Sequence, residues 1–177
     1  MVPKPRGTTV WLTGLPSSGK STLAIALAAR LSADGHGAQI IDADVVRSAL
    51  WPDLGFSRAD RVANVLRIEY VARLLAQHGV TVIVACIAPY ADVRAQVRRR
   101  HEDAGVGYVE VYVSTPLAVC RQRDVKGLYA RQEAGELQGL TGIDDVYEPP
   151  QDPNVEIDTS CLDEAACCDL IAAHLDK

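Results

Sequence analysis

Aromatic residues are scarce in this sequence. They make up 5% of its 177 residues, and Phe56 is the only phenylalanine. Taken alone, we expect this ring to belong to the hydrophobic core. Stacking on a nucleobase is the alternative that the residue leaves open.

Long apolar runs are also missing. Those present, such as VIVACIA at residues 82–88, are far too short to cross a bilayer. The opening residues, MVPKPRG, lack the apolar core of a secretory signal. We therefore expect a cytoplasmic protein without a membrane partner.

Neither an excess of positive charge nor a cysteine framework is present. Lysine and arginine number 18 against 23 acidic residues, a net charge of −5, which argues against nucleic acid as a partner but not against a local basic pocket for a small anion. The five cysteines form an odd set without metal-ligand spacing, so we expect ordinary reduced thiols rather than a disulfide, zinc, catalytic or redox site. They are Cys86, Cys120, Cys161, Cys167 and Cys168.

Strand-like and helix-like segments alternate along the chain. Apolar runs predict strands at 10–13, 39–42, 80–86, 108–113 and 154–159, and helical patterns cover 23–35, 57–78, 91–105 and 161–175. This alternation is typical of a parallel sheet covered on both faces. We predict a single α/β domain over residues 1–177, a three-layer α/β/α sandwich with a mainly parallel sheet of about five strands.

Residues 124–153 break this pattern, because they are rich in glycine, proline and acidic residues. The segment is longer than an ordinary connection. We therefore interpret it as a mobile lid rather than a linker.

The stretch GLPSSGKST at residues 14–22 has the P-loop pattern of two glycines followed by lysine and a hydroxyl residue. Its glycines let backbone N–H groups surround a phosphate, Lys20 can reach the β- and γ-phosphates, and Ser21 can ligate Mg²⁺. A plain serine-glycine turn is the alternative. The predicted nucleotide-binding residues are Gly14, Leu15, Pro16, Ser17, Ser18, Gly19, Lys20, Ser21 and Thr22.

Polar residues follow the second predicted strand. Asp42 and Asp44 share one face if the chain is extended, where they can hold Mg²⁺ or orient an attacking hydroxyl. Asp44 can also be the N-cap of a short helix, VVRSAL, and Arg47 is a candidate anion ligand. Ser57 is the expected N-cap of the next helix, which carries Arg61, Asn64, Arg67 and Ile68 along one face.

These motifs, in order, resemble the adenylyl-sulfate kinase (APS kinase) family of P-loop kinases from about residue 7 to 160. The similarity rests on GLPSSGKST, IDADVVR, GFSRADRVAN, VIVACIAPY, EVYVSTPLAVCRQRDVKGLYA and GELQGLTGIDDVYEPP. The resemblance implies transfer of the γ-phosphoryl group of MgATP to the ribose 3′-hydroxyl of adenosine 5′-phosphosulfate. The product is 3′-phosphoadenosine 5′-phosphosulfate, and ATP and Mg²⁺ are the implied cofactors.

The resemblance also implies residue roles. Asp44 matches a position at the acceptor hydroxyl and the metal, where Ser21 is the other metal ligand, and Lys126 matches a lid lysine near the phosphates. With Lys20, these two form the implied catalytic set. Arg123 matches a position near the ATP base. The implied acceptor site contains Asp42, Asp44, Arg47, Phe56, Arg61, Asn64, Ile87, Lys126 and Leu140, with Phe56 stacking on the adenine.

Several positions depart from the family pattern. Leu140 replaces the second aromatic of the adenine clamp, which predicts weaker acceptor binding with activity retained. Ala43, Leu66 and Ala88 replace a glycine, an arginine and a serine, so phosphorylation of that serine is excluded at position 88. Pro16 and Ser17 stand where the family often has Ser-Gly, which predicts a stiffer loop.

Two other functions compete with this hypothesis. One is another small-molecule P-loop kinase, acting on a nucleoside, gluconate or shikimate. The other is a nucleotide-binding module that has lost catalysis, which the departures at 43, 66, 88 and 140 motivate. The resemblance also implies a possible homodimer and a functional link to ATP sulfurylase. The use of the product, in assimilation or by a dedicated sulfotransferase, stays open.

Overall fold

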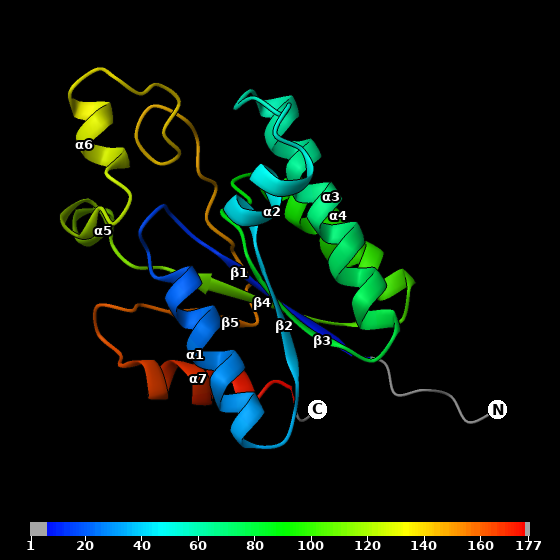
Figure 1. Ribbon diagram of the computed structural model, residues 1–177. Coiled ribbons are helices and arrows are strands. Elements are labelled where there is room, and N and C mark those ends of the chain that lie inside the picture. Colours follow the sequence, from blue (N-terminus) through cyan, green and yellow to red (C-terminus); the bar gives the residue numbers. More distant parts are fainter. Residues whose placement is uncertain (1–6, 176–177) are drawn as a thin grey trace.

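Five parallel strands form the centre of the molecule in a computed structural model that describes residues 7–175 (Figure 1). The strands are β1 (Thr8–Thr13), β2 (Ala38–Asp42), β3 (Thr81–Ala85), β4 (Gly107–Val113) and β5 (Val155–Ile157). The helices are α1 (Lys20–Ala33), α2 (Ala43–Leu50), α3 (Arg58–Gln77), α4 (Ala91–Asp103), α5 (Leu117–Arg123), α6 (Leu128–Glu133) and α7 (Glu164–Ala172).

The sheet has the strand order β2-β3-β1-β4-β5, and every neighbouring pair is parallel. β1 is the central strand, and its side chains alternate between two cores. Val10 and Leu12 are buried on one face, whereas Trp11 is buried on the other. After β1 the chain forms β2 and β3 on one side of it and then β4 and β5 on the other side. The carboxyl end of β1 is therefore a switch point of the topology, where parallel sheets bind ligands.

Helices cover both faces of the sheet (Figure 1). α1 and α7 lie on one face, where Leu23, Leu27 and Leu31 form a buried stripe one turn apart. α2, α3 and α4 lie on the other face, where the small side chains of Ala72 and Ala76 let α3 approach the strands closely. The predicted three-layer α/β/α architecture with a parallel five-stranded sheet is confirmed.

The strands and helices predicted from the sequence are present, and their first and last residues differ by a few positions from the predicted ones. Ser57 is the N-cap of α3, and it forms a capping box with Asp60. Two helices, α5 and α6, were not predicted from the sequence, and they lie beyond the carboxyl ends of the strands in Figure 1. These two helices are short, seven and six residues, so they carry little periodic signal.

Several expectations concern single residues. Phe56 is 67% exposed, so its assignment to the core was wrong. Cys86, Cys120, Cys167 and Cys168 are buried, Cys161 is exposed, and residues 7–175 contain no cluster of His, Cys, Asp and Glu able to hold a metal by itself. Within the same range, no helix has the length and apolar character to cross a membrane. The opening residues 1–6 lie outside the described residues.

Candidate functional site

A cavity of about 570 Å³ opens at the carboxyl ends of the strands. Five parts of the chain line it. They are the loop between β1 and α1 with the start of α1, the residues around the ends of β2 and β3, Phe56 and Arg61 at the start of α3, the segment from Arg123 to Thr141, and the residues from Thr159 to Cys167. The sequence-predicted residues that line it are Pro16, Ser17, Gly19, Lys20, Ser21, Thr22, Asp42, Asp44, Phe56, Arg61, Ile87, Arg123, Lys126 and Leu140. The structure thus brings most of the predicted site together.

The loop from Gly14 to Gly19 depends on glycine at both ends. Gly14 and Gly19 have φ angles of 151° and 103°, and a Cβ at Gly14 would lie 2.5 Å from the carbonyl oxygen of Val113. Ser17 also has a left-handed φ of 59°, a conformation that glycine adopts more readily. Gly14, Leu15 and Ser18 complete the loop behind the residues that face the cavity.

Lys20 begins α1 and folds back over this loop. Its Nζ donates hydrogen bonds to the carbonyl oxygens of Gly14 at 2.9 Å and Leu15 at 2.6 Å. Burial lowers the pKa of Lys20 to about 8. The ammonium group is therefore held inside the loop by groups that a phosphate can replace as acceptors.

Asp42 and Asp44 occupy different structural positions. Asp42 ends β2 as the N-cap of α2, since its Oδ1 accepts hydrogen bonds from the backbone N–H groups of Asp44 and Val45 at 3.0 and 3.5 Å. Its Oδ2 accepts from the hydroxyl of Ser21 at 2.6 Å. The prediction of an extended chain over 42–44 was wrong, and so was the assignment of the N-cap to Asp44, because the helix begins two residues earlier than VVRSAL.

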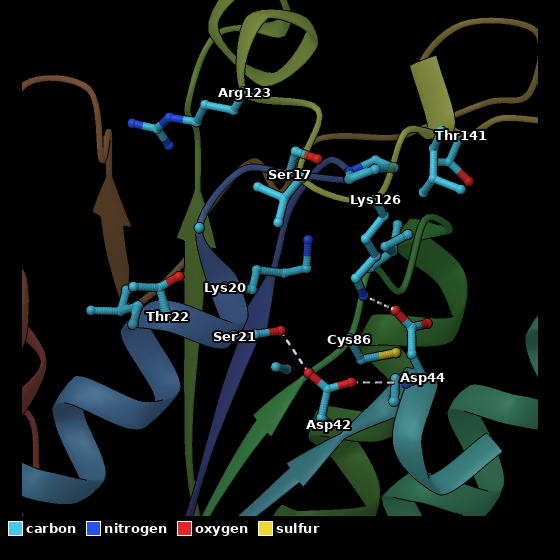
Figure 2. A pocket seen from close by; sticks show the side chains of 18 of the residues that line it. Ser17, Lys20, Ser21, Thr22, Asp42, Asp44, Cys86, Arg123, Lys126 and Thr141 are labelled. Carbon is cyan, nitrogen blue, oxygen red and sulfur yellow. Dashed lines mark hydrogen bonds and ion pairs between the residues drawn. The ribbon is translucent and has the colours of Figure 1, made fainter. Parts of the chain in front are cut away.

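Asp44 projects from the first turn of α2 toward the segment that follows α5. Its Oδ2 pairs with the Nζ of Lys126 across 82 residues of sequence. Figure 2 shows Lys126 reaching down from the segment after α5, while Asp42 and Ser21 pair below. Two carboxylates and two ammonium groups thus lie in one part of the cavity.

The chemistry of these donors suits a hard cation. Ser21 contributes a hydroxyl, and Asp42 and Asp44 contribute carboxylates, which are the oxygen ligands that Mg²⁺ prefers. Mg²⁺ usually takes one or two protein carboxylates and completes its shell with phosphates and water. The residues present therefore fit Mg²⁺ bound together with a nucleotide.

Phe56 and Leu140 lie on the side of the cavity formed by the start of α3 and by the turn at residues 139–145, which we call the 139–145 turn. Leu140 is 6% exposed and packs with Cys120 and Tyr129. The guanidinium of Arg61 contacts both regions, since it donates to the carbonyl oxygens of Phe56 at 2.9 Å and Gly139 at 2.6 Å.

Two predicted acceptor residues do not line the cavity. Arg47 donates to the carbonyl oxygens of Leu54, at 2.7 Å, and Gly55, and its guanidinium lies 4.5 Å from the centroid of the Phe56 ring. Asn64 is buried and accepts a hydrogen bond from the indole of Trp51 at 2.7 Å. Both side chains support the loop that presents Phe56.

Arg123 ends α5 on the other side of the cavity (Figure 2). Its guanidinium donates to the hydroxyl and the carbonyl oxygen of Thr159 at 2.7 and 3.0 Å. The hydroxyls of Thr159 and Thr115 donate to the carbonyl oxygen of Ser18 at 2.9 and 3.0 Å. Arg123 is therefore connected to the phosphate loop through a single threonine.

Several residues of the site were not predicted from the sequence. Thr141 and Thr159 line the cavity, Thr115 supports the phosphate loop, and Asp145 lies 3.1 Å from Nε of Arg61. A signal existed for Thr159, since it is the final residue of the last predicted strand and the carboxyl ends of parallel strands meet at one edge. Asp145 had no such signal, because it lies in an irregular turn.

The family model and the curated relatives that match this chain carry the same family name. The family model for adenylylsulphate kinase matches residues 6–158. The adenylyl-sulfate kinase of Microcystis aeruginosa is 51% identical over 88% of this chain and 84% of its own length. That of Myxococcus xanthus is 54% identical over 85% of this chain and 81% of its own.

A solved structure is similar over almost the full length. The Mycobacterium tuberculosis APS kinase CysC, in complex with AMPPNP and APS, superposes with a TM-score of 0.93 at 42% identity. The superposition covers 98% of this chain and 99% of that one. The arrangement of strands and helices described above is therefore shared with a protein whose structure is known in complex with both ligands.

Proposed function

The chain belongs to the adenylyl-sulfate kinase family, and we propose that it transfers the γ-phosphoryl group of MgATP to the 3′-hydroxyl of adenosine 5′-phosphosulfate. The observation that carries this proposal is one cavity lined by residues of the phosphate loop, by Asp44 and Lys126, and by Phe56 and Leu140. A similar protein is known in complex with AMPPNP and APS.

The donor nucleotide binds along the loop from Gly14 to Thr22. Backbone N–H groups of the loop and the N-terminal end of α1 stabilise the phosphates. Lys20 exchanges the carbonyl oxygens of Gly14 and Leu15 for phosphate oxygens and neutralises the charge that develops during transfer. Arg123 and the chain near Thr159 contact the adenine of ATP.

Asp44 and Lys126 act at the acceptor hydroxyl. Asp44 orients the 3′-hydroxyl and takes up its proton, as the 3′-oxygen forms a bond to the γ-phosphorus and the bond to the β,γ-bridging oxygen breaks. The departing oxygen stays on ADP. Lys126 separates from Asp44 and moves to the phosphates. There its ammonium group stabilises the negative charge of the phosphoryl group during transfer.

Ser21, Asp42 and Asp44 would hold Mg²⁺, and the bound ion would supply neutralisation of phosphate charge. Asp42 performs its own task without it, because its carboxylate holds the start of α2 and the hydroxyl of Ser21 together. Asp44 is thereby fixed as the second residue of α2, and its side chain lines the cavity.

The acceptor binds between Phe56 and Leu140. The exposed ring of Phe56 stacks on one face of the adenine, and Leu140 gives apolar contact on the other face. Ile87 forms part of the floor. Arg47 and Asn64 serve this site by fixing the loop that carries Phe56. This role replaces the predicted contact of Arg47 with the anion and the implied place of Asn64 in the acceptor site.

The chain acts as one catalytic domain over residues 1–177 in this proposal, and residues 124–153 close over the bound nucleotides. Closure excludes water and so limits hydrolysis of ATP. The contact of Lys126 with Asp44 supports the proposal, because it already connects this segment to α2. A cytoplasmic location, a homodimer and cooperation with an ATP sulfurylase, whose product is the acceptor, complete the proposal.

An acceptor panel tests this function. We expect ADP release from MgATP to depend on adenosine 5′-phosphosulfate and to yield 3′-phosphoadenosine 5′-phosphosulfate, with no release on gluconate, shikimate or nucleosides. The variant Asp44→Ala is the matched control, since it keeps the phosphate loop. ADP release that depends on another acceptor would identify a different kinase. Nucleotide binding without turnover in both proteins would identify an inactive module.

A further inference from the structure

The hydroxyl of Tyr129 joins helix α6 to the phosphate loop, and we propose that Tyr129 is a positioning residue that sets the place of Lys126 relative to that loop. The inference rests on the proposed function, because that function gives Lys126 its task at the phosphates. It adds a residue that touches neither nucleotide and acts through the backbone that carries Lys126.

The side chain of Tyr129 is buried between α6 and the loop. It is 2% exposed, and its ring packs with Cys120 and Leu140. Its hydroxyl donates to the carbonyl oxygen of Pro16 at 3.0 Å, although the two residues are 113 positions apart in the sequence. A buried hydroxyl has lost its hydrogen bonds to water, so it keeps the acceptor that it has. The bond therefore fixes the start of α6 against the middle of the phosphate loop.

Other carbonyl oxygens of the loop also have partners inside the protein. Those of Gly14 and Leu15 accept from Lys20, and that of Ser18 accepts from Thr115 and Thr159. Carbonyls held in this way leave the backbone N–H groups free to face a phosphate. Lys20 exchanges its carbonyls for phosphate oxygens when a nucleotide binds, whereas the neutral hydroxyl of Tyr129 stays on Pro16. Tyr129 is thus a fixed point of the loop before and after binding.

The residues from Asp124 to Ala130 form one internally bonded unit. The carboxylate of Asp124 accepts hydrogen bonds from the N–H groups of Tyr129 at 3.1 Å and Ala130 at 3.0 Å. Gly127, the N-cap of α6, has no side chain that could do this. The N–H of Gly127 donates to the carbonyl oxygen of Asp124 at 2.9 Å. Because this turn encloses Lys126, a bond that fixes Tyr129 also fixes the backbone of Lys126.

The side chain of Lys126 keeps its freedom. It is 53% exposed and pairs with the carboxylate of Asp44. With the backbone held at Tyr129, the move of the ammonium group from Asp44 to the phosphates is a rotation of the side chain. The closing movement of the proposed lid then falls on the residues that follow α6. A backbone shift of about 1 Å would misplace the ammonium group at the transferred phosphoryl group, and errors of this size slow catalysis.

Loss of one hydroxyl isolates this contact, because Tyr129→Phe keeps the ring that packs with Cys120. The experiment measures kcat and KM for MgATP with adenosine 5′-phosphosulfate as the acceptor. The variants are Tyr129→Phe, Lys126→Met and the double variant, which form a double-mutant cycle. Thermal melting reports whether each variant folds.

Tyr108→Phe is the matched control. Its hydroxyl is also buried, and it has no hydrogen-bond partner among residues 7–175. Tyr108 belongs to β4 and does not line the cavity. The substitution is chemically the same, so it accounts for the loss of a buried hydroxyl as such. We expect its kinetic constants to equal those of the wild type.

The proposal predicts that Tyr129→Phe lowers kcat about tenfold and changes KM for MgATP by less than about twofold, because Lys126 acts in the transition state. In the Lys126→Met background the same substitution should lower kcat by less than about twofold, since the group that Tyr129 positions is gone. Equal losses in the two backgrounds, or a rise of KM for MgATP as the main effect, would overturn the positioning role.

Hydrogen exchange tests the same contact without turnover. Tyr129→Phe should raise amide exchange several-fold in residues 14–19 and 124–130 together, whereas Tyr108→Phe should leave both segments unchanged. Unchanged exchange in either segment of Tyr129→Phe would overturn the inference. A wild type that turns over no adenosine 5′-phosphosulfate would overturn the proposed function, and hydrogen exchange would still decide whether Tyr129 holds the two segments together.

Discussion

The ammonium group of Lys126 pairs with the carboxylate of Asp44, and this pair joins the segment after α5 to the first turn of α2. Both side chains are more than half exposed, at 53% and 69%, so the pair contributes little to stability. Its value lies in position, because it brings two groups of the proposed reaction to one point of the cavity.

The first prediction concerns this pair. Asp44→Asn should lower kcat by about 10²–10⁴-fold, since the amide cannot take the proton of the acceptor hydroxyl. Lys126→Met should lower kcat by about 10²–10³-fold because the developing phosphoryl charge loses a cation. Steady-state kinetics of the single variants and the double variant measure both effects. Purely additive losses in the double variant would contradict a shared role in the transition state.

The second prediction concerns Leu140. Leu140→Phe should lower the dissociation constant of the acceptor by about twofold to tenfold, because the ring adds aromatic stacking worth about 0.5–1.5 kcal/mol. Calorimetric titration with adenosine 5′-phosphosulfate in the presence of ADP measures it. Leu137→Phe is a control in the same cavity, outside the 139–145 turn. An unchanged constant for Leu140→Phe would refute the clamp.

The third prediction concerns the protonation of Lys20. Burial lowers its pKa to about 8, so the free protein holds it increasingly neutral as the pH rises above that value. Bound phosphates raise the pKa of Lys20 again. ATP binding should therefore be accompanied by the uptake of close to one proton at pH 9 and of about none at pH 6.5. Titrations in two buffers with different ionisation enthalpies measure the uptake. Lys20→Arg, charged at both pH values, should abolish it, and uptake persisting in that variant would exclude Lys20 as its source.

The fourth prediction concerns the buried His101. Burial lowers its pKa below the ordinary 6.5, while its ring nitrogens bond to the carbonyl oxygen of Val97 and the hydroxyl of Thr9. The unfolded chain binds the proton more readily, so the free energy of unfolding should fall as the pH drops below 6.5, by at most about 1.4 kcal/mol per unit. Urea denaturation at pH 7.5 and 5.5 measures it.

The His101→Gln variant isolates this contribution, because it removes the titrating group while keeping a polar side chain near Thr9. Carboxylates whose pKa is lowered by hydrogen bonds to backbone N–H groups, such as Asp144, act on stability at lower pH. A dependence between pH 7.5 and 5.5 that is equally steep in His101→Gln would show that another group is responsible.

The fifth prediction concerns Thr159, whose hydroxyl joins Arg123 to the carbonyl oxygen of Ser18. Thr159→Val should raise KM for ATP by about threefold to tenfold with a smaller change in kcat, since the phosphate loop loses a fastening hydrogen bond. Thr159→Ser keeps the hydroxyl and should restore most of the affinity. A serine variant as impaired as the valine variant would indicate a packing role instead.

Local sequence signals carried the architecture of this protein. Apolar strands that alternate with amphipathic helices determine a parallel sheet, because this is how such strands bury both faces. Glycines at positions 14 and 19 determine the phosphate loop, since their φ angles exclude most side chains. Ser57 and Asp60 similarly determine the start of α3, because the capping box is a contact between near neighbours.

Only the tertiary structure decided how distant residues meet. The pairing of Lys126 with Asp44 and the reach of Arg61 to the 139–145 turn depend on irregular loops, whose paths follow no period that the sequence displays. It also decided that Phe56 is exposed and that Asp42 rather than Asp44 caps α2. Arg47 and Asn64 are bonded to Leu54 and Trp51 and do not line the cavity. Residue type limits what chemistry a site can perform, whereas packing decides which groups are left to perform it.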